Sequence, residues 1–306
     1  MTVQAGDRPL RVRDQIAARA QNAHRWSLKQ VREAVRFSLA RRDRTIPNMA
    51  ELRNLEVQGA TGPLAARLYT PMGAPQNGPL LLFFHGGGFV FCDLDTHDAL
   101  CARLADAAGV RILSCEYRLA PEHPFPAQLE DAVAAAQWVH RRARRLGADK
   151  RRILVGGDSA GGYLALATAK AMKRAFAGQV LIYPLMHLED DVWAETMGAN
   201  TRVIGRLAVR YIEAQLASAG MRAPSLLADG ALAPLPTVIA AGGHLDPCAP
   251  DTHACAERLR SLGAPVVVRT YPGQIHGFAN LTHTSAAARR AVDEIGRLTR
   301  QLANGL

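Results

Sequence analysis

Short apolar runs alternate with longer amphipathic stretches along most of the chain after Pro47. Eight of these runs are rich in branched and aromatic residues and have the length of β-strands. We predict strands at 52–57, 65–70, 80–84, 111–117, 153–157, 180–184, 237–242 and 266–271. Inner runs such as "LLLFF" at 80–84 are apolar at every position, which is typical of parallel strands covered on both faces.

Helical periodicity fills most of the intervals between these strands. We predict helices at 97–108, 127–146, 160–174, 252–262 and 285–303. Strands that alternate with helices predict a doubly wound α/β domain. The alternation breaks between Leu185 and Pro236, where a helical pattern replaces strands. We expect an insertion of this length to lie above the carboxyl ends of the strands, where open α/β sheets bind ligands.

The first 50 residues differ from the rest in charge. They hold eleven basic and four acidic residues, and so carry seven of the ten net positive charges of the chain. Leu28, Val31, Val35 and Leu39 form one apolar stripe at helical spacing, with arginines on the other side. A nucleic-acid or membrane-surface arm would also be basic. The stripe favours an amphipathic helix that covers part of the protein, so we predict no nucleic-acid partner.

Composition narrows the class of protein. A chain of 306 residues, 48% of them hydrophobic, can bury one large core. No apolar run approaches the roughly 18 residues of a membrane helix, and the first residues lack the apolar segment of a secretory signal. The five cysteines form no C-x-x-C pair and predict free thiols in a reducing compartment. We therefore expect a cytoplasmic protein without integral membrane association.

The segment "GDSAGG" at 157–162 matches the G-x-S-x-G pattern between a predicted strand and a predicted helix. A turn this tight strains the backbone of Ser159, and a Cβ at either flanking glycine would collide with the neighbouring strand and helix. A serine that only caps the helix is the alternative. The strand, turn and helix context, together with the groups described next, favours a nucleophilic Ser159.

Three further features supply the chemistry that a nucleophilic serine needs. His85 and the three glycines after it leave backbone N–H groups unobstructed for an oxyanion, although a flexible turn would use glycines too. Asp246 and His276 each follow a predicted strand, so both should lie at the same sheet edge as Ser159. Their order in the chain, Ser, Asp, His, is that of α/β hydrolases. A histidine would take the serine proton, and a carboxylate would fix its tautomer.

Other residues compete for these roles: His244, His283, Asp229 and Asp251. His283 lies where a helix is expected to begin, and His244 is too close in sequence to Asp246 to be its partner. We interpret Asp251 as the cap of the helix near Thr252. The chain lacks H-x-x-x-H, H-E-x-x-H, P-loop and dinucleotide-binding motifs. We therefore predict neither a metal nor a cofactor.

Five segments carry a resemblance to a known family: "HGGGF" (85–89), "YRLAPEHPFPA" (117–127), "GDSAGG" (157–162), "DP" (246–247) and "HGF" (276–278). As a set they resemble the hormone-sensitive-lipase-like branch of α/β hydrolases, the bacterial family IV esterases. The resemblance covers roughly residues 65–300. It implies an α/β-hydrolase fold with a central, mostly parallel eight-stranded sheet, flanking helices and a helical cap.

The resemblance also assigns residues and segments. It implies Ser159 as nucleophile, His276 as general base and Asp246 as its orienting acid. The implied oxyanion donors are the backbone N–H groups of Gly86, Gly87 and Ala160. The implied cap comprises 1–50 and 185–235, and the catalytic domain comprises 51–184 and 236–306. Segment 117–127 is expected to support the floor of the active site.

One position departs from the family pattern. Family members often carry a second acid four residues after the catalytic aspartate, where this chain has Pro250 followed by Asp251. The expected activity is hydrolysis of a small-molecule ester with a short to medium acyl chain. An acyltransferase or amidase with the same triad, and a non-catalytic binding protein on this scaffold, remain alternatives. The resemblance leaves a homodimer open.

Overall fold

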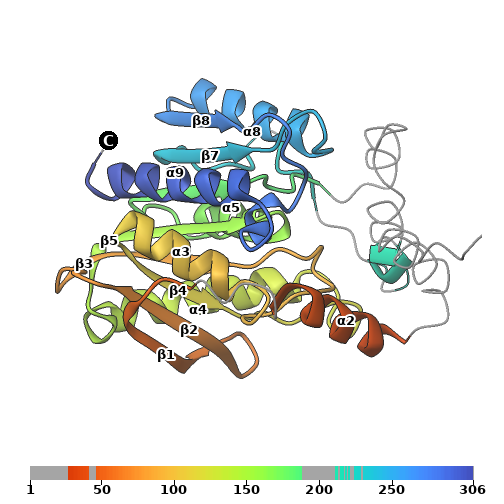
Figure 1. Cartoon of the computed structure of the whole chain (residues 1–306), viewed down its shortest axis with the longest axis horizontal. Helices are drawn as coiled ribbons and strands as arrows, with labels where there is room; N and C mark the ends of the chain where they lie inside the picture. Colours follow the sequence, from red (N-terminus) through yellow and green to blue (C-terminus); the bar gives the residue numbers. More distant parts are fainter. Residues whose placement is uncertain are drawn as a thin grey trace, which may run out of the picture.

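An eight-stranded sheet forms the centre of the computed structural model (Figure 1). The structure describes residues 27–40, 46–187, 211–212, 214–216, 218, 220, 224–228 and 230–305. The strands are β1 (Met49–Gln58), β2 (Pro63–Pro71), β3 (Gly78–Phe84), β4 (Arg111–Cys115), β5 (Ala148–Asp158), β6 (Gly178–Ile182), β7 (Thr237–Ala241) and β8 (Val266–Thr270). Each predicted run overlaps one of these strands, which confirms all eight, although the runs predicted at β4, β6, β7 and β8 extend one or two residues too far.

The strand order is β1-β2-β4-β3-β5-β6-β7-β8. β2 is antiparallel to both of its neighbours, β1 and β4. Every other neighbouring pair is parallel. The sheet is therefore mostly parallel, as predicted, and the strands from β3 onward deliver the loops after them to one edge.

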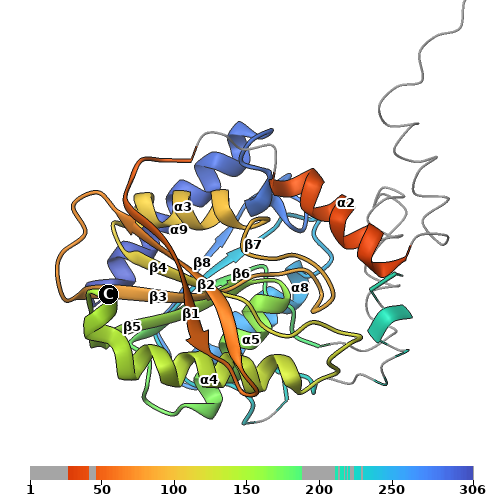
Figure 2. The same cartoon turned by 90° about the horizontal axis from the view of Figure 1, so that it is seen from below.

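Helices cover both faces of the sheet (Figures 1 and 2). One face carries α3 (Asp98–Ala108) and α9 (Ala286–Ala303), and the other carries α4 (Ala127–Arg142), α5 (Ala160–Ala171) and α8 (Ala249–Ser261). Two short 3₁₀ helices are η2 (Ala143–Leu146) and η3 (Phe278–Leu281). Among the described helices, none combines the length and the apolar character needed to cross a membrane.

Strand β3 shows why the inner runs are apolar at every position. Leu80, Leu82 and Phe84 are buried in the core layer beneath α4 and α5. Leu81 and Phe83 are buried in the separate layer beneath α3 and α9. Because successive side chains of a strand point to opposite faces, a sheet with two covered faces needs an apolar residue at each position.

Several predicted helices have different limits in the structure, and two of these differences are informative. The stretch 127–146 divides into α4 and η2, and η2 ends at Leu146, just before Gly147, whose φ of 70° suits glycine. Helix α8 begins at Ala249, so Asp251 lies inside its first turn and the predicted capping role is wrong. Pro250 permits the earlier start, because the first turn of a helix needs no donor from its N–H groups.

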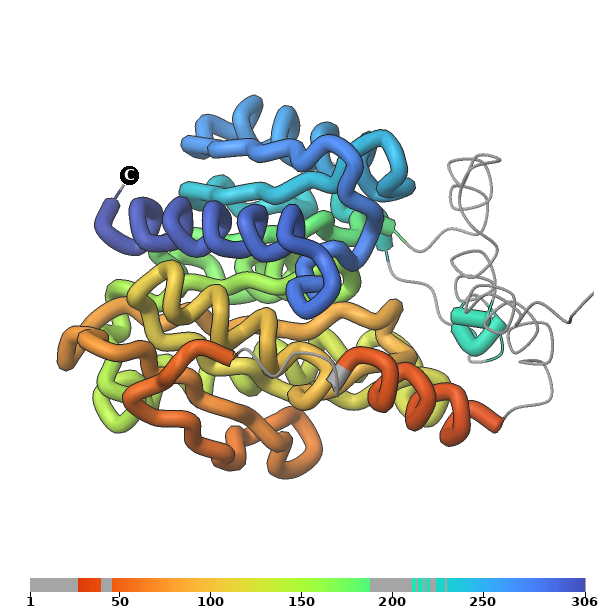
Figure 3. Tube along the Cα trace, viewed as in Figure 1, coloured from red at the N-terminus to blue at the C-terminus, as the bar shows by residue number. Residues whose placement is uncertain are grey.

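The predicted amphipathic helix near the start of the chain is α2 (Leu28–Ala40). Its apolar residues Leu28, Val31 and Val35 pack against the core layer of α4 and α5. The helix lies beyond the carboxyl ends of the parallel strands (Figures 1 and 3). Residues 1–26 and 188–210 of the predicted cap lie outside the described residues, so the division into cap and catalytic domain stays a prediction.

Arg32 anchors α2 to the loops that follow β3 and β4. Its guanidinium donates hydrogen bonds of 2.8 Å to the carbonyl oxygens of Val90 and Ala120. It also pairs with the Glu122 carboxylate at 2.6 Å. Val90 directly follows the segment "HGGGF", so this basic side chain binds protein groups next to the predicted oxyanion loop. At this position a positive charge of the basic N-terminal segment binds groups of the protein itself.

Candidate active site

Ser159 stands at a strained turn between β5 and α5. Its backbone has φ 51° and ψ −118°, outside the regions that non-glycine residues favour. The Ser159 N–H donates to the Ile182 carbonyl oxygen at 2.9 Å, which fixes the turn to strand β6. A Cβ at Gly157 or Gly161 would overlap the carbonyl oxygen of Phe84. The predicted steric need for both glycines is therefore confirmed.

A chain of two hydrogen bonds joins the three predicted catalytic residues. Ser159 Oγ lies 2.9 Å from Nε2 of His276. Nδ1 of the same imidazole lies 2.9 Å from Oδ1 of Asp246. These residues follow β5, β8 and β7, so the parallel sheet brings them to one edge from positions far apart in sequence. Asp246 and Ser159 are both buried, which keeps bulk water from competing for these bonds.

The surroundings of His276 favour its protonated form. Burial by itself lowers the pKa of an imidazole, because a charged ring loses its hydration. The neighbouring Cys248 and Asp246 side chains act in the opposite direction, the carboxylate through its negative charge and its hydrogen bond. The pKa of His276 therefore lies well above its ordinary value of 6.5. Since only the neutral ring can accept a proton from Ser159, this site should lose activity as the pH falls.

The loop after β3 offers a different pair of oxyanion donors from the pair that the resemblance implies. The Gly86 N–H donates to Oδ1 of Asp158 at 2.9 Å, so the predicted role of Gly86 as an oxyanion donor disagrees with the structure. The N–H groups of Gly87 and Gly88 have no acceptor within the described part of the chain. Ala160 is the first residue of α5, where an N–H has no partner in its own helix. Gly87, Gly88 and Ala160 thus remain able to bind an anion.

A buried acid lies directly before the serine. Oδ1 of Asp158 is 3.1 Å from Nε2 of His97, and Oδ2 accepts a 3.4 Å hydrogen bond from the Tyr183 hydroxyl. Burial alone raises the pKa of Asp158. The charge and hydrogen bond of His97, together with the Gly86 N–H, lower the pKa by more than burial raises it. The net pKa lies below the usual range, so this carboxylate is charged. It connects the serine turn with the oxyanion loop.

Replacing Asp158 with alanine should destabilise the protein strongly. The substitution leaves His97, the Gly86 N–H and the Tyr183 hydroxyl buried without this acceptor. Loss of one member of a buried, hydrogen-bonded pair typically costs about 3–5 kcal/mol in the free energy of unfolding. Urea denaturation followed by circular dichroism would measure it. Asp106→Ala, at an exposed position of α3, is the matched control and should change little; equal midpoints for both variants would contradict the role given to Asp158.

The segment 117–127 supports the oxyanion loop from below. The Tyr117 hydroxyl donates to the His85 carbonyl oxygen at 2.8 Å, and the two rings stack with centroids 4.4 Å apart. The Ala120 N–H donates to the Phe89 carbonyl oxygen at 2.9 Å. These contacts confirm the structural role predicted for the segment. They also explain how the short glycine run keeps a defined path.

The competing candidates take other places in the structure. Asp251 pairs with Nε2 of His187 at 2.9 Å, away from the Ser159 hydrogen-bond chain. The His244 side chain is exposed to solvent. His283 lines a cavity to which no member of the predicted triad contributes. Asp229 lies outside the described residues.

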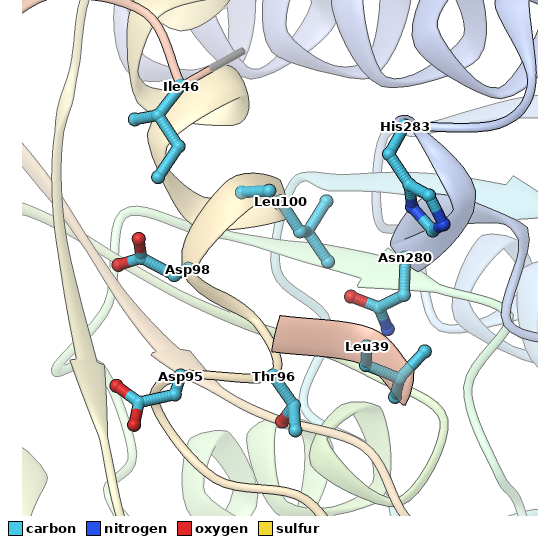
Figure 4. Close-up of a pocket in the computed structure, with 9 residues that line it drawn as sticks. Leu39, Ile46, Asp95, Thr96, Asp98, Leu100, Asn280 and His283 are labelled. Carbon is cyan, nitrogen blue, oxygen red and sulfur yellow. The ribbon is translucent and has the colours of Figure 1, made fainter. Parts of the chain in front are cut away.

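That cavity, of about 280 Å³, lies between the end of α2, the start of α3 and η3 (Figure 4). Its lining residues are Leu39, Ile46, Asp95, Thr96, Asp98, Ala99, Leu100, Asn280 and His283. Arg67 neutralises both acids, with N–O distances of 2.9 Å to Asp95 and 2.8 Å to Asp98. Because Ser159 does not reach it, we do not assign the ester to this cavity.

Two residues at the site gained no role from the sequence. Asp158 precedes the serine in the sequence, but its partner His97 lies 61 positions away, so no local pattern indicates their contact. Cys248 counted only as a free thiol, yet its N–H donates to Asp246 Oδ1 at 2.9 Å and its buried thiol hydrogen-bonds with His276. The spacing of two residues between Asp246 and Cys248 is the signal, since aspartates often accept the N–H two positions ahead.

Known proteins resemble this chain in sequence and in fold. A model of the alpha/beta hydrolase fold matches residues 81–280. Esterase LipI of Mycobacterium tuberculosis is 35% identical over 285 residues, 88% of this chain and 88% of LipI. The ethyl acetate hydrolase of Pseudomonas putida is 46% identical over 132 residues, 40% of this chain and 41% of that protein. The structure of a hyperthermophilic esterase from the archaeon Pyrobaculum calidifontis has a TM-score of 0.81 and 30% identity, covering 95% of this chain and 96% of its own. The chain belongs to the α/β-hydrolase fold family, in its hormone-sensitive-lipase-like branch of esterases.

Proposed function

We propose that the protein hydrolyses carboxylic esters through an acyl-enzyme formed on Ser159. The observation that carries the proposal is the unbroken hydrogen-bond chain from Ser159 Oγ through His276 to Asp246, with both bonds at 2.9 Å. This is the order of groups that converts a weakly nucleophilic hydroxyl into an attacking group. The esterases among the relatives support the same reaction class.

In the first half of the reaction, Ser159 Oγ attacks the ester carbonyl carbon while Nε2 of His276 accepts the hydroxyl proton. The carbonyl oxygen becomes an oxyanion, and the N–H groups of Gly87, Gly88 and Ala160 are the donors proposed to stabilise it. Asp246 holds the Nδ1 proton and stabilises the imidazolium. Collapse of the tetrahedral intermediate breaks the bond to the alcohol, which leaves with the proton from Nε2.

In the second half, water replaces the alcohol. Nε2 of His276 accepts a proton from the water as its oxygen attacks the acyl carbon. A second oxyanion forms at the same donors, the bond to Ser159 Oγ breaks, and the serine regains its proton from His276. The acid leaves and the enzyme returns to its starting state without a metal or cofactor taking part in any of these steps.

We propose short to medium acyl chains as the substrate class. One relative is named for its substrate, ethyl acetate, whose acyl group has two carbons, and it supports the lower end of this range. The cap predicted from 1–50 and 185–235 would enclose the acyl chain and limit its length. A pocket closed at one end rejects added methylenes once it is full.

A panel of p-nitrophenyl esters tests this function. We expect kcat/KM to be greatest between acetate and octanoate and to fall by at least about tenfold for palmitate, because each poorly accommodated methylene weakens transition-state binding. Initial rates at matched ester concentrations, kept below the micelle threshold, give the profile. Turnover of none of the esters, or highest activity toward palmitate, would contradict the proposal.

A further inference from the structure

Cys248 stands beside the proposed acid and base but takes no part in the hydrolysis. It lies in the loop between β7 and α8, two residues after Asp246, and its side chain is buried. One ligand atom from each of Asp246, Cys248 and His276 lies within 4.8 Å of the other two. A carboxylate, a thiol and an imidazole therefore converge at one point of the active site.

We propose that these three side chains bind a thiophilic divalent cation such as Zn²⁺, and that the bound cation switches the esterase off. The inference rests on the proposed function, because it uses the roles of Asp246 and His276 in catalysis. Thiolate, imidazole and carboxylate are the three kinds of protein ligand that zinc prefers. Three of them plus one open position is a common zinc coordination in proteins.

The distances suit such an ion after small movements. Bonds of about 2.0–2.3 Å to a tetrahedral zinc place ligand atoms about 3.3–3.8 Å from one another. The present separations, 2.9 Å between His276 Nδ1 and Asp246 Oδ1 and up to 4.8 Å within the group, lie on either side of that range. Asp246 Oδ2 is also buried without a hydrogen-bond partner among the described residues, so it has lone pairs to offer a cation.

Inhibition follows from the tautomer of the imidazole. In the resting site Nδ1 of His276 carries the proton that Asp246 accepts, and Nε2 offers a lone pair to Ser159. A cation that binds Nδ1 takes the lone pair of that atom, so the single proton of the neutral ring moves to Nε2. Protonated Nε2 cannot accept the serine proton. The bond from zinc to Cys248 Sγ forms as the S–H bond breaks, and one proton goes to solvent.

The sequence did not indicate this site because no local motif encodes it. The ligands come from the loops after β7 and β8, and 30 positions separate Asp246 from His276. The expectation that the enzyme needs no metal concerns a cofactor. The present inference concerns an inhibitor that competes with catalysis for the same two side chains.

Zinc titration of the hydrolysis rate tests the switch. Each variant's rate without zinc serves as its own reference. We expect zinc to inhibit the natural protein and EDTA to restore its activity. In Cys248→Ala the half-inhibitory zinc concentration should rise at least about tenfold, since even loss of a residue that only hydrogen-bonds to a metal ligand costs 10–100-fold in metal affinity. Cys248→Ser keeps the side-chain size and replaces this variant if it does not fold.

Two control variants distinguish this site from adventitious zinc binding. His244→Ala removes an exposed imidazole from the same loop, and Cys255→Ala removes a buried thiol from α8. Both should keep the zinc sensitivity of the natural protein. Equal sensitivity of Cys248→Ala and the natural protein, or an enzyme that zinc does not inhibit, would overturn the inference.

Cobalt binding gives a readout that needs no turnover. Co²⁺ bound to a thiolate absorbs in the near ultraviolet through sulfur-to-metal charge transfer. We expect this band in the natural protein and in Ser159→Ala, and its loss in Cys248→Ala. A protein that shows the band but hydrolyses no ester would contradict the proposed function and leave the metal site supported. Absence of the band from the natural protein would overturn the metal site itself.

Discussion

Ser159→Ala should lower kcat toward p-nitrophenyl butyrate about 10⁶-fold, as removal of the nucleophile does in other serine hydrolases. Alanine keeps the backbone and the Cβ but has no oxygen to form the acyl bond. The remaining groups can still bind the ester and stabilise an oxyanion, so a small residual rate over water is expected. Steady-state kinetics with purified protein would measure the loss, and a fluorophosphonate probe should no longer label the protein.

The fold of this variant should be intact. The Ser159 N–H, which donates to Ile182, is retained, and the substitution removes the hydrogen bond between Oγ and His276. The thermal midpoint should therefore stay close to that of the natural protein. Ser261→Ala, at an exposed position at the end of α8, is the control and should keep full activity. Ester hydrolysis by Ser159→Ala at the natural rate would exclude Ser159 as the nucleophile.

The sheet could be predicted from the sequence because its physical causes are local. A strand covered on both faces needs an uninterrupted apolar run, and such runs mark β3, β5 and β6 clearly. The first and last residues of the strands and helices were less predictable. β5 begins at Ala148, five residues before its apolar run, because the polar stretch after Gly147 continues the strand. Periodicity reports burial, and the exposed ends of strands and helices carry little of that signal.

In the candidate site, too, some features could be predicted from the sequence and others could not. Ser159, Asp246 and His276 could be named because each follows a strand of a parallel sheet, and the topology then brings them together. The engagement of the Gly86 N–H with Asp158 could not be predicted, since two loops 72 positions apart must first be packed. The neighbourhood of Cys248 and His276 has the same origin. Local patterns locate groups along the chain, whereas hydrogen-bond partners depend on tertiary packing.

The proposed function assigns the chemical step and the selection of a substrate to different parts of the site. The turn at Ser159 is held by backbone bonds, by glycines without space for a Cβ and by the buried carboxylate of Asp158. These constraints lie within the sheet and are the same for any ester. We propose that selection depends on residues beyond the strand ends, of which α2, anchored through Arg32, is the described example. Substitutions in α2 should therefore alter substrate preference more than the chemical step.

Asp246→Asn should lower kcat about 10⁴-fold and move the pH dependence of the remaining activity to lower pH. An asparagine amide can donate to Nδ1 of His276 and so favour the tautomer with a proton on Nε2, which cannot accept the serine proton; the analogous change in a serine protease costs about that factor. The Asp246 carboxylate also raises the pKa of His276. Without its charge, the ring loses its proton at lower pH.

The direction in which the pH profile moves follows from the protonation state of His276 that reacts. Activity needs neutral His276, so kcat/KM rises as the pH increases through the His276 pKa. That limb should lie above pH 6.5 in the natural protein, because the pKa is raised above this value, and lower in Asp246→Asn. Profiles of kcat/KM between pH 5 and 9 would show it. Asp251→Asn is the matched control: its carboxylate pairs with His187, so both the rate and the limb should stay unchanged. If Asp251→Asn moved the limb and Asp246→Asn did not, Asp251 would be the orienting acid.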